Sequence, residues 1–83
     1  MDLKPAVNLL EKIMNDRTVP KNIRAAAESS RNELMNENNS SEVKISTAIN
    51  ILDEIINDPN MPMYTRTQIW NVVSILEENR RKN

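Results

Sequence analysis

Residues 48–66, AINILDEIINDPNMPMYTR, decide the fold that we predict for this chain. They have the pattern of an apolar helix that ends, a turn with two prolines, and a second helix that begins. Residues 6–24, AVNLLEKIMNDRTVPKNIR, follow the same order, and one offset of 42 residues, the distance from Asp16 to Asp58, aligns the two stretches without a gap. The offset also pairs Pro20 with Pro62 and Arg24 with Arg66. The chain is therefore predicted to be one helical hairpin written twice.

The rest of the chain extends this pattern to four helices. Apolar residues at spacings of three, four and seven predict helices over about residues 2–15, 20–35, 41–57 and 62–81. The polar segment NENNSS, residues 36–41, separates hairpin one (2–35) from hairpin two (42–81). The 83 residues suit one domain. We therefore predict a single all-α domain (1–83), a four-helix bundle made of two repeated antiparallel helical hairpins.

Residues that can start or stop a helix stand near the predicted ends. Asp2 can cap the first helix, Thr18 the second, and Asn39 with Glu42 can form a capping pair for the third. The chain contains no glycine, so Asn15 is predicted to end the first helix in the left-handed conformation. Each turn is thus expected to be set by its own polar side chains.

The helices differ in how much apolar surface they carry. The second helix has a thin apolar side with three alanines at residues 25–27, whereas the third has apolar residues over more than one stripe. Small side chains let a neighbouring helix approach closely. We therefore expect Trp70, the single tryptophan, to pack against the alanine face of the second helix.

The composition removes several kinds of chemistry. Without cysteine the chain can form no disulfide framework and no thiolate metal site. Without histidine and glycine it lacks the commonest general base and any glycine-rich phosphate loop. No pairing of a nucleophile with a base can be identified. We therefore expect a protein that is not an enzyme, with no catalytic residue, no cofactor and no bound metal.

Charge and hydropathy narrow the possible partners. Eleven Lys and Arg against 12 Asp and Glu give a net charge of −1, which argues against a nucleic-acid coat protein but leaves room for a local basic face. Residues 1–5 show no basic segment followed by an apolar run, and no run approaches the ~20 apolar residues that span a bilayer. We expect a cytoplasmic protein without a membrane partner.

One segment resembles a known helical repeat. DRTVPKNIRAAA, residues 16–27, is similar to the turn and second helix of a HEAT repeat, and the 42-residue offset falls within the ~40–47 residues of that class. Stacked repeats need about three units to bury their faces, and this chain has two. We therefore expect the two hairpins to close on each other as a bundle.

A second resemblance is closer. Residues 16–27, together with ILDEIINDPNMP (51–62) and RTQIW (66–70), resemble the small archaeal proteins grouped as uncharacterised protein family 0147. The resemblance covers nearly the whole chain except the central polar loop and the basic tail. Membership implies an all-helical bundle in an archaeal cytoplasm, and it carries no established activity, substrate or catalytic residue.

The turn of hairpin two offers candidate protein-binding residues. Met61, Met63 and Tyr64 surround Pro62 at the predicted hairpin tip, where two methionines and a tyrosine are unusual for plain solvent. Methionine adapts to varied surfaces and is common at interfaces. Alternatively, Met61 corresponds to Val19 and plugs the end of the bundle, which leaves Met63 and Tyr64 unexplained. Both interpretations stay open.

A basic face on the second helix is the candidate nucleic-acid site. The face comprises Arg17, Lys21, Arg24 and Arg31, of which the first three recur at spacings of four and three. The simpler interpretation is a solvated helix face beside Glu28 and Glu33. In the same way, the Asn-Asp pair and the arginine of each turn could form two polar sites, but a cap and a local ion pair explain them.

The sequence leaves the biological role unknown and favours one class of function. We expect a small non-enzymatic protein-interaction module that binds a protein partner or a second copy of itself, since the chain is short, apolar on its third helix and without a catalytic set. The alternative is an accessory RNA- or DNA-binding protein that uses the basic face of the second helix.

Overall fold

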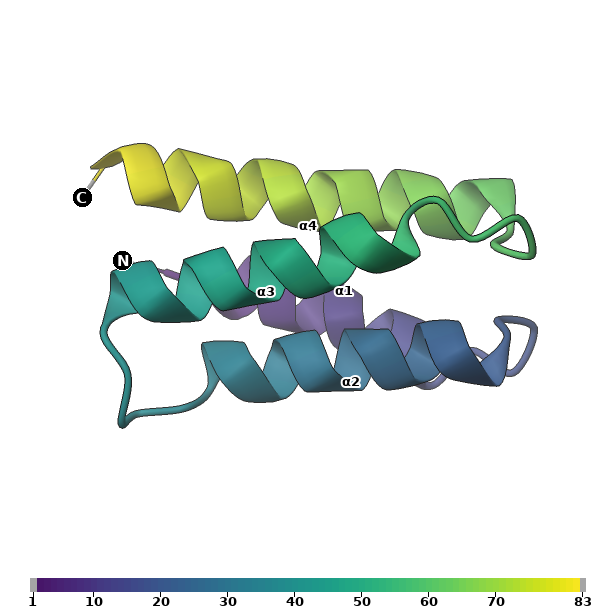
Figure 1. The fold of residues 1–83 in the computed structure, drawn as a ribbon, viewed down its shortest axis with the longest axis horizontal. Coiled ribbons are helices and arrows are strands. Elements are labelled where there is room, and N and C mark those ends of the chain that lie inside the picture. Colours follow the sequence, from purple (N-terminus) through teal and green to yellow (C-terminus); the bar gives the residue numbers. More distant parts are fainter. Residues whose placement is uncertain (1, 83) are drawn as a thin grey trace.

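The computed structural model describes residues 2–82, and this part of the chain is all-α, as predicted. It contains four helices: α1 (Lys4–Met14), α2 (Lys21–Leu34), α3 (Ser41–Ile55) and α4 (Met63–Lys82). Successive helices run antiparallel and form a bundle (Figure 1). Each helix packs against two neighbours in the cyclic order α1, α2, α3, α4, and no diagonal pair is in contact within residues 2–82.

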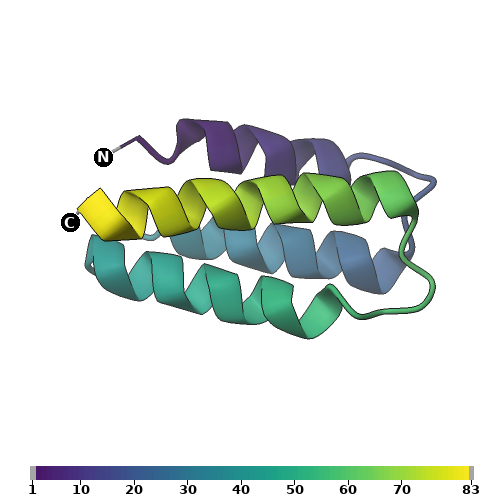
Figure 2. The same cartoon turned by 90° about the horizontal axis from the view of Figure 1, so that it is seen from above.

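The two hairpin turns lie at the same end of the bundle. Residues 15–20 connect α1 to α2 and residues 56–62 connect α3 to α4, and both connections lie on the right in Figures 1 and 2. We call this the tip end. The connection between α2 and α3 lies at the opposite end, where α1 begins and α4 ends (Figure 2). The tip end therefore brings together two turns that are far apart in sequence.

The buried residues recur at the offset that aligned the two hairpins. Ala6, Leu10, Val19, Ile23, Ala27, Ser30 and Leu34 are buried, and so are their counterparts 42 residues later, Ala48, Leu52, Met61, Thr65, Ile69, Val72 and Leu76. In some pairs the two side chains differ in size: Ala27 is smaller than its counterpart Ile69, and Ser30 is smaller than Val72. That the hairpins are one repeated unit stays a prediction, but the same positions of each build the core.

The helix ends differ from the sequence predictions. Asn15 has a φ of −97°, and no non-glycine residue in the described range has a positive φ, so the left-handed stop is wrong. Pro20, not Thr18, is the N-cap of α2, and it makes no side-chain cap bond. Ser40, not Asn39, caps α3 by accepting a hydrogen bond from the backbone N–H of Val43. For α1 the N-cap position is Leu3, but the Asp2 side chain accepts a hydrogen bond from the backbone N–H of Lys4 at 3.0 Å. The capping residue was therefore wrong for α2 and α3, although the stretches in which these helices begin were predicted.

A shared turn replaces the missing glycine at all three connections. The side chains of Asp16, Asn36 and Asp58 each accept a hydrogen bond from the backbone N–H two residues later, at 2.9, 2.9 and 2.8 Å. The backbone N–H of each of these residues also bonds to the carbonyl three residues earlier. Such an Asx turn redirects the chain without a positive φ. The central loop therefore turns in the same way as the two hairpins.

Trp70 does not pack on the alanine face of α2, so that prediction is wrong. Its side chain is 54% exposed, and α4 lies diagonally across the bundle from α2. The physical reason is the helical position, because Ile69, Val72 and Leu76 turn one side of α4 into the core and leave residue 70 outside. Glu28, its counterpart in hairpin one, is exposed as well.

Candidate interaction surface

Two hydrogen bonds join the hairpins at the tip end. The Tyr64 hydroxyl donates to Oδ2 of Asp16 at 2.7 Å, and the Asn22 side-chain amide donates to Oδ2 of Asp58 at 2.7 Å. Tyr64 and Asn22 each occupy the second residue of a helix, and each bonds to the turn of the other hairpin. The offset of 42 residues relates both the donors and the acceptors. Each turn is therefore held by its own backbone and by the opposite hairpin.

Asp16 is the centre of a small polar network. Its Oδ1 accepts hydrogen bonds from the backbone N–H of Thr18 at 2.9 Å and from the Thr18 hydroxyl at 2.6 Å. The hydroxyl oxygens of Thr18 and Tyr64 also contact each other, and each donates its single proton to Asp16. The bonds from Thr18 and then the bond from Tyr64 hold the pKa of Asp16 below its ordinary value of 3.8. Asp16 thus accepts these bonds as a carboxylate at neutral pH.

The two corresponding arginines behave differently. Arg66 donates from Nε to the carbonyl of Ile56 and from Nη2 to the carbonyl of Asp58, both at 3.1 Å, and so braces the turn before α4. The predicted ion pair with the Asp58 carboxylate is not formed in the described structure. The side chain of Arg24 makes no hydrogen bond to any described residue, and its Nε is buried without a partner. Arg24 therefore does not brace the turn of hairpin one as Arg66 braces the turn of hairpin two.

The three candidate protein-binding residues divide into two groups. Met61 is 6% exposed and packs in the core at the tip end. Met63 is 70% exposed and Tyr64 49% exposed. The hydroxyl of Tyr64 is fixed by Asp16, so its ring is held in one place at the surface. Met63 and Tyr64 are accessible to a partner, whereas Met61 serves the bundle.

Trp70 extends this accessible surface along α4, and sequence reasoning missed it. Met63 and Trp70 are seven residues apart, which places them on one side of the helix two turns apart. We call this side, over residues 63–74, the outer face of α4, and its exposed residues are Met63, Thr67, Trp70, Asn71 and Ser74. No charged residue occurs between Arg66 and Glu77. The alignment of Trp70 with Glu28 was the available sign that this position faces solvent.

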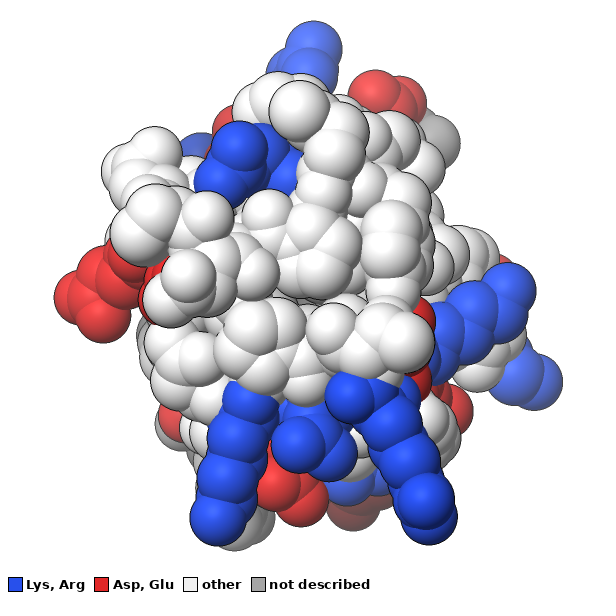
Figure 3. All heavy atoms as spheres, turned by 90° about the vertical axis from the view of Figure 1, so that its right-hand side faces the viewer, with Lys and Arg blue, Asp and Glu red and all other residues white. Residues whose placement is uncertain are grey.

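The tip end continues the uncharged surface. Figure 3 views the bundle from this end and shows an area without Lys, Arg, Asp or Glu at its centre. Lys and Arg side chains project from the lower edge, where α2 begins (Figures 1 and 3). The end of the bundle thus presents a centre of uncharged residues with charged side chains around it.

The comparisons with known proteins agree with this fold. Residues 1–78 match the model of an uncharacterised protein family, UPF0147. The chain belongs to this family. Over 75 residues it is 56% identical to UPF0147 protein MJ1419 of Methanocaldococcus jannaschii, covering 90% of this chain and 81% of the relative. A UPF0147 protein of Sulfolobus acidocaldarius is 55% identical over 75 residues, with 90% and 84% covered.

Two crystal structures resemble this UPF0147 chain closely. That of MMP1188, a protein of unknown function, has a TM-score of 0.88 and 55% identity, and the match covers 90% of this chain and 85% of that one. That of a UPF0147 protein from Thermoplasma acidophilum has a TM-score of 0.85 and 39% identity, with 89% and 87% covered. The relatives are archaeal, as the resemblance implied, and the family has no assigned function. The role must therefore be argued from the surface.

The four candidate nucleic-acid-binding residues do not share one exposed row. Arg17 and Lys21 are exposed, whereas Arg24 and Arg31 are partly buried. Nη1 of Arg31 lies 3.2 Å from Oε2 of Glu11 and links α2 to α1. A surface for a phosphate backbone would therefore begin from Arg17 and Lys21, with Arg24 at its inner edge.

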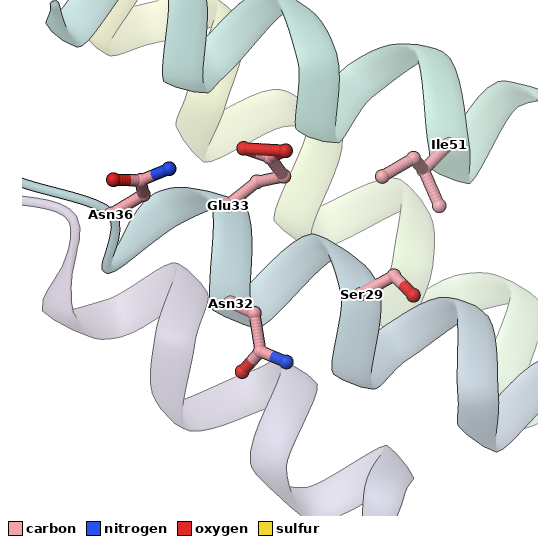
Figure 4. Close-up of a pocket in the computed structure, with 5 residues that line it drawn as sticks. All are labelled: Ser29, Asn32, Glu33, Asn36 and Ile51. Atoms are coloured by element: carbon pink, nitrogen blue, oxygen red, sulfur yellow. The ribbon is translucent and has the colours of Figure 1, made fainter. Parts of the chain in front are cut away.

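Two open cavities lie beside α2. One, of about 310 Å³, is lined by Ser29, Asn32, Glu33, Asn36 and Ile51, and the Glu33 side chain points toward α3 (Figure 4). The other, of about 360 Å³, is lined by Met14, Asn15, Lys21, Arg24, Ala25 and Glu28, and we call it the α1/α2 cavity. Within the described residues, no group of three acidic, histidine or cysteine side chains could hold a metal ion. None of the helices in residues 2–82 has an apolar stretch that could span a lipid bilayer.

Proposed function

We propose that this chain is a non-enzymatic protein-interaction module that binds a protein partner with the outer face of α4. The observation that carries the proposal is the exposure of Met63 and Trp70 on one side of a regular helix. An exposed tryptophan and methionine among exposed neutral residues have the composition of an interface centre. Neither side chain belongs to the bundle core, so both are available to a partner.

The rigidity of the surface supports the proposal. The core-facing side of α4 packs against α1 and α3, which fixes the helix along its length. At its start, Arg66 braces the preceding turn and Tyr64 is bonded to Asp16 of the other hairpin. A surface that is already ordered loses little conformational entropy on binding. Met63 and Trp70 are therefore presented by a preorganised helix.

The proposed partner is another protein or a second copy of this chain. An outer face without charge is compatible with an apolar groove or with the same face of a second molecule. Sedimentation at increasing protein concentration tests whether the partner is a second copy of this chain. A chain that stays monomeric at all concentrations would exclude self-association. The module is proposed to act in the cytoplasm, which cell fractionation would test.

The experiment is a nuclease-treated pull-down from the native cytoplasm with matched variants. Wild type, Met63→Ala, Trp70→Ala and Met35→Ala are compared, because Met35 is similarly exposed at 57% but lies at the end of α2. We expect Met63→Ala and Trp70→Ala to lose the partner. For Trp70→Ala, the expected loss of affinity is roughly 30-fold, as for a residue at the centre of an interface. Met35→Ala should bind like wild type. Equal losses for Met35→Ala and Met63→Ala would overturn the assignment to α4.

A second candidate function is binding of RNA or DNA. The exposed Arg17 and Lys21, four residues apart at the start of α2, favour it. Counterion release predicts that affinity falls steeply as the salt concentration rises. Arg17→Gln should remove one phosphate contact and so reduce the slope of log affinity against log salt concentration by about one. Binding that does not change with salt would remove this candidate. Proteins lost from the pull-down on nuclease treatment would favour it over the α4 surface.

A further inference from the structure

We propose that the α1/α2 cavity binds one carboxylate group supplied by a protein partner. The Arg24 guanidinium and the Lys21 ammonium would hold the carboxylate. The cavity is lined by residues at the end of α1 and the start of α2, at the tip end of the bundle. It does not include the outer face of α4, so the proposal can hold or fail separately from the proposed function.

The first argument is the unused hydrogen-bonding capacity of Arg24. A guanidinium has five N–H donors, and in Arg66, the counterpart of Arg24, two nitrogens donate to backbone carbonyls of the preceding turn. The Arg24 side chain makes no hydrogen bond to any of residues 2–82 that the structure describes, and its Nε is buried. A buried donor without an acceptor is costly. The two terminal nitrogens of Arg24 are not among the buried atoms, and they remain available to an acceptor from outside.

The second argument is the arrangement of charge and donors in the lining. Lys21 precedes Arg24 by three residues, so the two cations lie on neighbouring turns of the same helix face. The amide of Asn15 lies in the same lining and uses Nδ2 to donate to the Glu11 carbonyl. Two cations and one anion, Glu28, therefore line a cavity with a net positive charge.

The third argument selects a carboxylate over a phosphate. Glu28 lines the cavity. Asp16 lies close enough to Arg24 for the positive charge of Arg24 to help lower the pKa of Asp16. The two cations and these two carboxylates sum to zero charge, so the site offers no net Coulomb attraction to offset the larger desolvation cost of a phosphate dianion. A carboxylate monoanion costs less to desolvate. Met14 and Ala25 supply apolar lining for methylene groups. A carboxylate on a short apolar stem suits this environment.

The test is an NMR titration of ¹⁵N-labelled chain with sodium acetate, with sodium chloride adjusted to hold ionic strength constant. We expect saturable shifts in the backbone amides of Lys21 and Ala25 and in the Nε–H of Arg24. Arg24→Gln should weaken acetate roughly tenfold, the effect of one charge-assisted hydrogen bond. The matched control is Arg17→Gln, which removes the same charge near the cavity but outside its lining, and it should weaken acetate less than about threefold.

Several outcomes would overturn the proposal. These are shifts that do not saturate, equal losses for the Arg17 and Arg24 variants, and inorganic phosphate that binds more tightly than acetate at the same pH. Lys21→Gln provides a second variant, which should also weaken acetate, so the test does not rest on the folding of Arg24→Gln alone. Two further ligands identify the source of the carboxylate: glutamate blocked at both ends presents a side chain, and N-acetylalanine presents a chain terminus.

Discussion

The Tyr64 hydroxyl donates a 2.7 Å hydrogen bond to Asp16, a residue 48 positions earlier in the other hairpin. The corresponding bond from Asn22 to Asp58 spans 36 positions and has the same length. Together the two bonds join each turn to the start of the helix in the opposite hairpin. The tip end is therefore closed by long-range polar contacts, whereas the middle of the bundle is held by apolar packing.

Removing the Tyr64 hydroxyl should weaken this closure. Tyr64→Phe keeps the ring and deletes the bond to Asp16, so we expect the urea midpoint of unfolding to fall. Urea denaturation followed by circular dichroism measures the change. Thr67→Ser is a control on the same helix, because it keeps the hydroxyl that donates to the Met63 carbonyl. An unchanged midpoint for Tyr64→Phe would show that this bond does not stabilise the fold.

Asp16 should make the stability depend on pH in the acid range. Its pKa is lowered in the folded protein, so the unfolded chain binds a proton first as the pH falls. The stabilisation is present above the ordinary value of 3.8 and is lost as the pH falls through the lower, folded pKa. Asp16→Asn should remove this part of the acid destabilisation, measured as urea midpoints at a series of pH values. Asp53→Asn, at an exposed site on α3, is the control.

Thr65 offers a substitution that should stabilise the protein. Its side chain is fully buried and its Oγ1 has no hydrogen-bond partner in the described structure, while the corresponding residue of hairpin one is Ile23. Thr65→Val exchanges the hydroxyl for a methyl group of similar volume, so the free energy of unfolding should rise by about 1 kcal/mol. Thr67→Val, at an exposed site, should bring no such gain. A loss of stability in Thr65→Val would mean that the hydroxyl is satisfied after all.

Trp70 should contribute little to folding. Because its side chain is about half exposed, Trp70→Ala is expected to change the free energy of unfolding by less than about 1 kcal/mol. Leu76→Ala, which truncates a fully buried residue of the same helix, should cost about 2–5 kcal/mol. Thermal melts of the two variants make the comparison. A large loss for Trp70→Ala would return this residue to the core and remove it from the proposed interface.

The helices and most of the core could be predicted from the sequence because both follow a regular period. Apolar spacing located four helices, and the match of the two halves identified corresponding positions such as Leu10 and Leu52. The helix ends were harder, because capping by Ser40 or an Asx turn at Asp16 depends on backbone geometry that several neighbouring polar residues could supply. The sequence therefore predicted where the chain turns but not which side chain turns it.

The candidate surface could be predicted only in part. Met63 and Tyr64 were found because they stand out at a turn, but Met61 beside them is buried, since it occupies the same position as Val19. Trp70 was assigned to the core because of its apolar character, although its helical position faces outward. The bond between Tyr64 and Asp16 depends on how the hairpins close on each other, which local patterns do not contain.

The measurement that tests the central claim most directly is site-specific photo-crosslinking in living cells. A photoreactive phenylalanine derivative replaces Trp70 in one strain and Met35 in another, because both side chains are more than half exposed and Met35 lies at the end of α2, outside both proposed binding surfaces. The account predicts a nuclease-resistant protein adduct from position 70, either with a partner or with a second copy, and none from position 35. Adducts of equal yield from both positions, or an adduct from position 35 alone, would contradict binding by the outer face of α4.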